Sequence, residues 1–237
     1  MKKFFFYTLF FLSLPQILFS SVGIITAFDK HQDLLIDAFD SVTHKSFYSF
    51  DFYSGNINNV SYTVVKPNMG SLNNAIAALI LIDKWNPDII LSFAFAGTLD
   101  TGLKQGDICI GNSFEWYEYG TEKDFGFVYG INTGLSKPVL CNFGSKNFPF
   151  VSVKIISGDK FIESKVKKDY LKTSFKASLV DSNSYHIAKV CNIAKKKNFI
   201  FRVVSDYSAD NARKQFKDFA ADYDYKKFNN IIFDFFK

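Results

Sequence analysis

Short apolar runs alternate along the chain with segments whose apolar residues recur at helical spacing. Residues 22–27 and 88–94 are apolar runs that end in small residues, a pattern typical of strands buried on both faces of a sheet. Residues 29–39 and Ser71–Trp85 show helical spacing instead, and Asn-Pro at 86–87 ends the second of them. The same patterns predict a hairpin of strands at 46–53 and 60–65, further strands at 107–111, 151–156 and 199–204, and helices at 185–196 and 213–236.

This order of elements indicates an α/β fold, because strands that alternate with helices place the helices on the faces of one sheet. We therefore expect a single three-layer domain with a central mixed, largely parallel β-sheet flanked by helices. The 237 residues, 48% of them hydrophobic, suffice for one such core, and the chain shows no linker and no internal repeat.

The first 20 residues have a different character from the rest. Lys2 and Lys3 precede the apolar run 4–14, and the segment ends in the small residues Ser20 and Ser21, as secretory signal peptides do. Even residues 4–19 fall short of the ~20 residues that a membrane-spanning helix needs, although an uncleaved anchor is the alternative. We expect cleavage near residue 20, a domain at residues 21–237, and export to the periplasm, the cell surface or the medium.

Composition excludes several classes of function. The three cysteines are too few and too scattered for a disulfide framework, and the three histidines lack metal-site spacing, so we expect neither a metal nor an organic cofactor. The formal charge of +5 includes Lys2 and Lys3 of the segment expected to be removed. The remaining positive charge is too small to indicate nucleic-acid binding.

Candidate ligand-binding residues gather where predicted strands give way to loops. In open α/β sheets ligands bind beyond the carboxyl ends of the strands. Four such places stand out, at residues 26–31, at 68–71 together with 94–97, at 157–162 and at 202–206. Each alone is a weak signal, since a Ser-Asp pair after a strand is commonly a helix cap. Their order and spacing together are specific.

Together these stretches resemble the 5'-methylthioadenosine/S-adenosylhomocysteine nucleosidases of the purine nucleoside phosphorylase superfamily. The matching sequences are Gly-Ile-Ile-Thr-Ala at 23–27, Asn-Met-Gly-Ser-Leu-Asn-Asn-Ala at 68–75, Pro-Asp-Ile-Ile at 87–90, Ala-Gly at 96–97, Leu-Lys-Gln-Gly-Asp-Ile at 103–108, Phe-Gly-Phe-Val-Tyr-Gly at 125–130, Ser-Gly-Asp-Lys-Phe-Ile at 157–162 and Arg-Val-Val-Ser-Asp at 202–206. The resemblance implies a nucleoside phosphorylase-like fold, a homodimer, and hydrolysis of a purine nucleoside with a 5'-thioether substituent to release adenine.

The resemblance implies an intact purine pocket. Asp206 corresponds to the acid that protonates the departing base, and a general acid contributes about 10²–10⁴-fold because a neutral purine leaves more readily than an anion. Ser205 is expected to orient this acid. Phe161 is expected to stack on the base, and the backbone of Ile162 to bind the purine edge.

The sugar end departs from the family in three places, one of them a pair of residues. His31 stands where the family has a glutamate that handles the attacking water. Ser182 and Asn183 stand where a Met-Glu pair binds the ribose hydroxyls, and Phe95 replaces a serine that helps to hold the water. Arg202 is present and is expected to contact the water or the ribose, and Ala96 and Gly97 are present as further substrate-binding residues.

These departures weaken the chemistry in different ways. Asn183 still forms hydrogen bonds but lacks the charge that favours a cationic ribose, and charge-assisted bonds are roughly twice as strong as neutral ones. His31 is either a new base for the water, since an imidazole titrates near pH 6.5, or a solvent-facing residue at the start of a helix. Phe95 offers no hydrogen bond.

Two hypotheses about function follow from these departures. The protein is either an exported nucleosidase with a rebuilt water site or a catalytically silent nucleoside-binding protein.

Basic clusters at residues 165–168, 195–197 and 213–217 add a further alternative. Acidic residues lie among them, as on an ordinary solvated surface. If the clusters share one face, the silent protein is instead an adhesin for a sulfated glycosaminoglycan, bound through charge and sensitive to salt.

Overall fold

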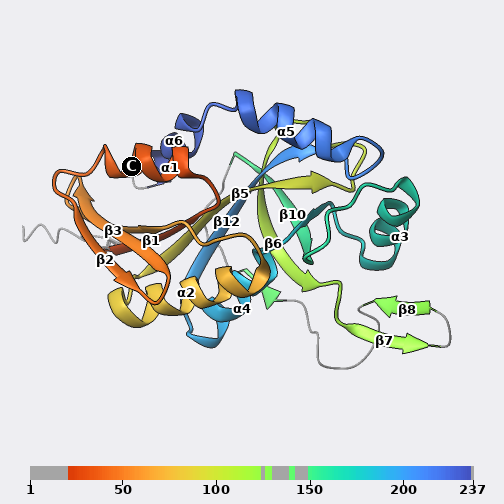
Figure 1. Ribbon diagram of the computed structural model, residues 1–237, viewed down its shortest axis with the longest axis horizontal. Helices are drawn as coiled ribbons and strands as arrows, with labels where there is room; N and C mark the ends of the chain where they lie inside the picture. Colours follow the sequence, from red (N-terminus) through yellow and green to blue (C-terminus); the bar gives the residue numbers. More distant parts are fainter. Residues whose placement is uncertain (1–20, 124–125, 130–138, 142–148, 236–237) are drawn as a thin grey trace, which may run out of the picture.

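A mixed β-sheet with helices on both faces forms the body of the protein in the computed structural model (Figure 1), which describes residues 21–123, 126–129, 139–141 and 149–235. The strands are β1 (Ser21–Thr26), β2 (Thr43–Phe47), β3 (Phe50–Ile57), β4 (Val60–Val65), β5 (Ile89–Thr98), β6 (Ile108–Trp116), β7 (Gly120–Lys123), β8 (Gly126–Tyr129), β9 (Val139–Leu140), β10 (Val151–Ser157), β11 (Leu179–Asp181) and β12 (Lys197–Asp206). The helices are α1 (Asp29–Ile36), α2 (Ser71–Trp85), α3 (Lys165–Phe175), α4 (Ser184–Ile193), α5 (Ala212–Asp222) and α6 (Lys226–Phe235).

At one end the sheet has an open edge, and at the other end its strands form a closed ring. β1 pairs in parallel with β4 and β5, and β3 and β2 extend the sheet beyond β4 as an antiparallel hairpin. On the other side β5, β12, β6, β10 and β11 pair in that order, and β11 pairs again with β5, so that these strands form a ring. The predicted mixed sheet flanked by helices is confirmed; the short closing strand β11 was not foreseen.

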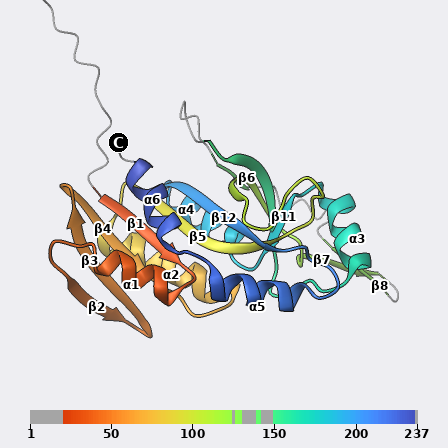
Figure 2. The ribbon, with the colours of Figure 1, turned by 90° about the horizontal axis from the view of Figure 1, so that it is seen from above.

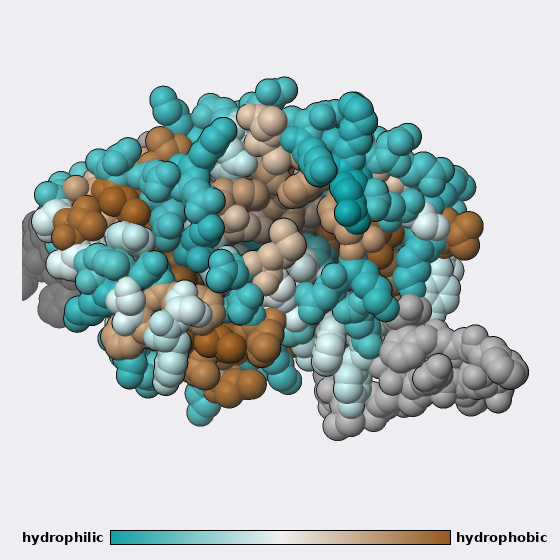
Figure 3. All heavy atoms as spheres, viewed as in Figure 1, coloured by the Kyte–Doolittle hydropathy of each residue, from teal (hydrophilic) through white to brown (hydrophobic). Residues whose placement is uncertain are grey.

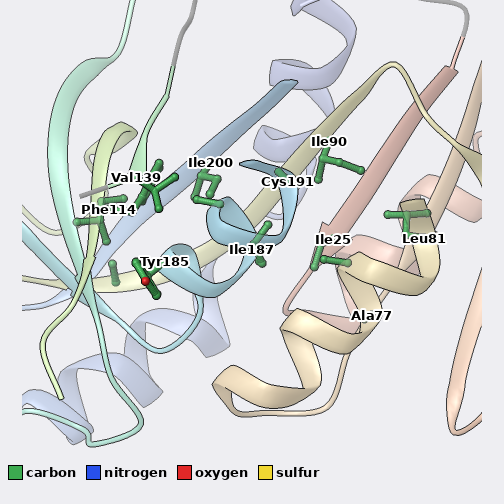
Figure 4. Packing of buried hydrophobic residues seen from close by; sticks show 14 of the residues in the cluster. Ile25, Ala77, Leu81, Ile90, Phe114, Val139, Tyr185, Ile187, Cys191 and Ile200 are labelled. Carbon is green, nitrogen blue, oxygen red and sulfur yellow. The ribbon is translucent and has the colours of Figure 1, made fainter. Parts of the chain in front are cut away.

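The two faces of the sheet carry different cores. α2 and α4 cover one face, and α1, α5 and α6 cover the other (Figures 1 and 2). Under α2 and α4 the packing is largely aliphatic: Ala77 and Leu81, one helical turn apart, lie against Ile25 and Ile90 (Figure 4). The opposite face is rich in aromatic side chains, mainly from β5, β12, α5, α6 and the bend between these two helices. Full burial of a large apolar side chain stabilises the fold by roughly 1.5–3 kcal/mol.

Two predicted elements differ from the structure, and one helix was missed. The predicted strand 46–53 is two strands, because Tyr48 adopts a left-handed φ of 57° and turns the chain between β2 and β3. The predicted helix 213–236 is two helices, α5 and α6, separated by a bend in which Tyr223 and Tyr225 are buried. Helix α3 was missed, although Ser164 caps it by accepting a hydrogen bond from the Lys167 backbone N–H.

The predicted signal segment, residues 1–20, lies outside the described residues. Within the part of the chain that the structure describes, every helix is too short or too polar to cross a membrane. Of the 125–130 motif, residues 126–129 form β8, which pairs with β7, and the other two lie outside the description.

Candidate active site

A cavity of about 680 Å³ opens at the carboxyl ends of the strands, where the sequence predicted ligand binding. Figure 3 shows a hollow with apolar side chains near the centre of the face viewed there. The walls come from residues 27–28, 66–70, 94–97, 158–162, 180–183 and 205–206, with Asn74, Ser208 and Phe216. Segments that are more than 150 residues apart in the sequence therefore share one site.

Asp206 is a buried acid of this cavity, and it ends β12. Ser205 Oγ donates a hydrogen bond to Asp206 Oδ2 at 2.8 Å, and the Ser208 backbone N–H donates to Oδ1 at 3.0 Å. Burial raises the pKa of Asp206, and these two bonds and the charge of Lys168 oppose the rise in part. The carboxyl therefore keeps its proton to a higher pH than an ordinary aspartate. Each of its oxygens retains one position for a ligand.

The loop after β10, which holds the predicted base-binding residues, is fixed to its neighbours. Gly158 lies so close under the ring of Tyr117 that a Cβ there would collide with it. The Asp159 carboxylate accepts hydrogen bonds from the Ser71 backbone N–H at 2.9 Å and from Ser71 Oγ at 2.7 Å. It thereby caps α2 from a distant part of the chain. Glu118 accepts a bond of 2.8 Å from the Asp159 N–H.

Phe161 and Ile162 line the cavity at the end of this loop. The Phe161 side chain is 43% exposed, meets the ring of Phe216 edge to face at 5.8 Å, and lies 5.6 Å from the Arg213 guanidinium. Ile162 is buried. Phe161 is thus a part-exposed ring that lines the cavity, with the Arg213 guanidinium over one of its faces.

At the sugar end, both polar groups of the Asn183 amide are bound within the protein. Asn183 Oδ1 accepts a hydrogen bond of 2.7 Å from Arg202, and Nδ2 donates to Asn74 Oδ1 at 3.0 Å. Arg202 is completely buried and does not line the cavity, although it was predicted to contact the water or the ribose. Its Nε donates to Asp181 Oδ2 at 2.7 Å. In this geometry Arg202 orients Asn183 rather than the ligand.

Asp181 brings a carboxylate to this end of the cavity, but its lone pairs are taken. Oδ1 accepts from Ser157 Oγ at 2.6 Å and from the N–H groups of Asn183 and Ser184. Oδ2 accepts from Arg202 and from the Ser184 hydroxyl. A carboxylate saturated in this way holds the loop and the guanidinium in place and has little capacity left for a ribose or a water.

Phe95 closes the cavity at the position where the family has a serine. Its ring lines the cavity, and its centroid lies 4.3 Å from that of Phe28. Further aromatic rings surround it, from α5, α6 and the bend between them: Phe216, Phe219, Tyr223, Tyr225 and Phe228. The wall that would hold a water is therefore aromatic.

His31 lies inside the aromatic core and away from the cavity lining. Its side chain is completely buried, and its ring contacts Phe93 at 5.2 Å and Phe228 at 5.0 Å. Nδ1 and Thr26 Oγ1 are 2.8 Å apart. Burial lowers the pKa of His31 to about 3, and the neighbouring Asn229 amide opposes this only in part. The ring is neither the solvent-facing helix start nor, in this geometry, within the cavity as a base.

Ser182, Ala96 and Gly97 all line the cavity, as the resemblance implied. Ser208 also lines it and was overlooked, although it follows the Ser-Asp pair by only two residues. Phe28 and Phe216 were missed as well. Phe28 lies inside a stretch already singled out, whereas only the tertiary structure brings Phe216 to the site.

Comparison with known proteins agrees with this architecture. The family model of the phosphorylase superfamily matches residues 21–230. The 5'-methylthioadenosine/S-adenosylhomocysteine nucleosidase of Buchnera aphidicola is 30% identical over 227 residues, which are 90% of this chain and 97% of the relative. The chain belongs to this nucleosidase family. The fold and family expected from the motifs are thereby confirmed.

Two solved structures have the same fold as this nucleosidase-family chain. The nucleosidase of Colwellia psychrerythraea in complex with adenine has a TM-score of 0.74 and 21% identity, covering 85% of this chain and 88% of that one. The futalosine hydrolase of Helicobacter pylori has a TM-score of 0.75 and 20% identity, covering 84% and 90%. Since the fold carries more than one activity, the side chains in the cavity decide what this member does.

Proposed function

We propose that this nucleosidase-family member binds a purine nucleoside with a 5'-thioether, or its adenine base, and hydrolyses the N-glycosidic bond weakly or not at all. One observation carries the proposal: the acid of the purine end is present and buried, while the sugar end holds no free carboxylate among the described lining residues. Asp206 keeps ligand positions on both oxygens. At the other end Asn183 and Asp181 are bound by Arg202, and Phe95 fills the wall.

The chemistry of Asp206 suits adenine. A carboxyl with one free position on each oxygen can donate its proton to an acceptor such as N7 and accept a hydrogen bond from the neighbouring 6-amino group. Its raised pKa favours the protonated form that N7 needs. Phe161 supplies the stacking surface.

The losses at the sugar end are large enough to suppress turnover. If each substitution removed even about 2 kcal/mol of transition-state stabilisation, the rate would fall about 30-fold per position, although such effects do not add strictly. An amide in place of a carboxylate also removes the charge that stabilises a cationic ribose. Binding of the base depends on none of these groups.

Calorimetric titration with adenine and methylthioadenosine, together with an assay of adenine release, tests the proposal. We expect saturable binding that falls at least about tenfold in Asp206→Ala, because alanine supplies neither the donor for N7 nor the acceptor for the 6-amino group. The matched control is Asp218→Ala, at an exposed carboxylate that forms an ion pair with Lys214 on α5. Robust release of adenine by the wild-type protein would overturn the proposal. Release that also disappeared in His31→Ala would instead support the rebuilt nucleosidase.

The basic clusters do not add support for the polyanion alternative. The two clusters at 165–168 and 213–217 carry ion pairs with acids: Lys165 with Asp169, Arg213 with Glu163, and Lys214 with Asp218. The cluster at 195–197 leads into β12, whereas 213–217 follows its other end, and a strand of 10 residues separates the two by about 30 Å. Glycosaminoglycan binding remains a prediction without a structural argument.

The proposal includes a homodimer formed through the outer face of α2. Leu72 and Leu79 are exposed there, at 69% and 57%, and Met69, which precedes the helix, is 92% exposed. Figure 3 shows a group of hydrophobic side chains where α2 and α4 lie in Figure 1. Apolar side chains gathered on one helix face mark an interaction surface more often than scattered ones do.

Export is also part of the proposal, and the features of residues 1–20 support it. Fractionation of cells that make the full-length chain tests it. We expect the protein in the exported fraction with a mass that corresponds to loss of about 20 residues, and the full-length chain in the cytosol would contradict export.

A further inference from the structure

Two side chains from other elements hold the residue that follows the acid Asp206. The register between β12 and β5 shifts between Val204 and Asp206, so the strand bulges just before the acid. A bulge of this kind turns the next side chain in a new direction and interrupts the ladder of the sheet. Beyond it the Tyr207 N–H donates to Gln215 Oε1 at 3.2 Å, and the Tyr207 carbonyl accepts a hydrogen bond of 2.7 Å from Lys168 Nζ. The position of the acid therefore depends on α5 and α3 as well as on the sheet.

Lys168 lies where a lysine is unfavourable for the helix that carries it. It belongs to the first turns of α3, where the helix dipole disfavours a positive charge. Partial burial and the charge of Lys172, one helical turn further along α3, both lower the pKa of Lys168. Its hydrogen bond to the Tyr207 carbonyl is charge-assisted and so stronger than a neutral one. A residue that is unfavourable for its own helix and forms such a bond indicates a role outside that helix.

The charge of Lys168 also acts on the Asp206 carboxyl. Burial raises the pKa of Asp206, and the hydrogen bonds from Ser205 and Ser208 and the positive charge of Lys168 oppose that rise. Without this charge the carboxyl would keep its proton to a higher pH. The other charged groups that act on one or the other member of this pair are Glu163, which is bound to Arg213, Lys172, which lies 3.9 Å from Asp100, and Asp169.

We infer that Lys168 is a positioning residue for Asp206: it fixes the backbone after the acid and keeps a positive charge near the carboxyl, and it thereby sets the upper pH limit of purine binding. This rests on the proposed function, in which a protonated Asp206 donates to N7 of the base. Once the carboxyl has lost its proton, it cannot donate to N7, and two lone pairs face one another. A nearby positive charge brings that loss to a lower pH. Lys168 needs no contact with the base for this role.

Two measurements test the inference: calorimetric titration with adenine between pH 5 and pH 8, and the pH titration of the Asp206 carboxyl carbon by NMR in the ligand-free protein. Asp206→Ala identifies the resonance. Lys168→Met removes the charge and the donor, whereas Lys168→Arg keeps both. The matched control is Lys165→Met, which removes one positive charge from an exposed lysine of the same helix that pairs with Asp169.

In Lys168→Met we expect Asp206 to titrate at a higher pH than in the wild-type protein. The loss of adenine affinity between pH 5 and pH 8 should accordingly be at least about twofold smaller in this variant. Lys168→Arg and Lys165→Met should both behave like the wild-type protein. Damage to the fold would instead weaken binding at every pH and would not extend binding to higher pH.

An Asp206 titration that is unchanged in Lys168→Met, or that changes equally in Lys165→Met, would overturn the inference. So would an adenine affinity that falls with pH in Lys168→Met as it does in the wild-type protein, and that result would leave the proposed function standing. If the wild-type protein binds no adenine at any pH, the proposed function fails, and the NMR titration still decides whether Lys168 acts on the acid.

Discussion

The Arg202 guanidinium donates a hydrogen bond of 2.7 Å to Asn183 Oδ1, and both side chains are buried behind the sugar end of the cavity. The amide is thereby turned so that its NH₂ group faces Asn74. A carboxylate at position 183 would give the guanidinium a second anionic partner besides Asp181. With an amide there, the charge of Arg202 is balanced by Asp181 alone, and the sugar end presents a neutral surface.

Replacing Arg202 by methionine should destabilise the protein strongly. The substitution leaves Asp181 buried at 3% exposure without its cation, and breaking a buried pair in this way costs about 3–5 kcal/mol. Urea denaturation measures the loss. The control is Arg213→Met, which removes an exposed ion pair with Glu163 and should cost less than about 1 kcal/mol. Equal losses of unfolding free energy in the two variants would show that the buried ion pair contributes no more to stability than the exposed one.

Restoring the family residues at the sugar end should raise the rate of adenine release. Phe95→Ser opens the aromatic wall and offers a hydroxyl to a water, and Asn183→Glu returns the negative charge beside the ribose. We expect the double variant to release adenine at least about tenfold faster than the wild-type protein, with smaller gains from each single change, because water and charge act on the same transition state.

Phe95→Ala in the same double combination is the matched control. It opens the same space without a hydroxyl, so it should gain less. Both replacements remove a well-packed ring and should lower the free energy of unfolding by about 3–5 kcal/mol, so the assay is run well below the unfolding temperature. If neither double variant released adenine faster than the wild-type protein, the residues that limit turnover would lie elsewhere.

The sequence placed Asp206 and Ile162 in the cavity but misplaced His31 and Arg202, for a physical reason. Asp206 ends β12 and Ile162 lies in the loop that follows β10, where local patterns determine position. His31 also lies in such a stretch, yet α6, almost 200 residues downstream, packs on α1 and buries the ring against Phe228. Asn229 Nδ2 even donates to the Leu34 carbonyl on α1. Long-range packing of this kind leaves no mark on the local hydrophobic pattern.

Burial of His31 should make stability depend on acid. Its pKa is about 3 in the folded protein against an ordinary value of 6.5, so the unfolded chain takes up a proton that the folded one refuses. The contribution of the neutral ring is complete above pH 6.5 and is lost as the pH falls toward 3, by roughly 1.4 kcal/mol per pH unit. The variant His31→Phe keeps an aromatic ring at this position and removes the nitrogen that takes up the proton.

Between pH 6 and 4.5 the wild-type protein should therefore lose about 2 kcal/mol more of its unfolding free energy than His31→Phe does. Urea denaturation at several pH values measures both curves, and their difference cancels the titration of all other groups. Parallel curves would mean that the imidazole is protonated in the folded state, and His31 would again be a candidate base.

The apolar face of α2 provides a test of assembly. Leu72 and Leu79 are seven residues apart, hence on one side of the helix, and both side chains are more than half exposed. We expect the wild-type protein to behave as a dimer in light scattering at about 10 μM and Leu72→Asp with Leu79→Asp to behave as a monomer, because two buried charges in each subunit would face one another across the interface. Val166→Asp, an equally exposed apolar residue on α3, should remain dimeric. A monomeric wild-type protein, or a double variant that stays dimeric, would remove this face from the interface.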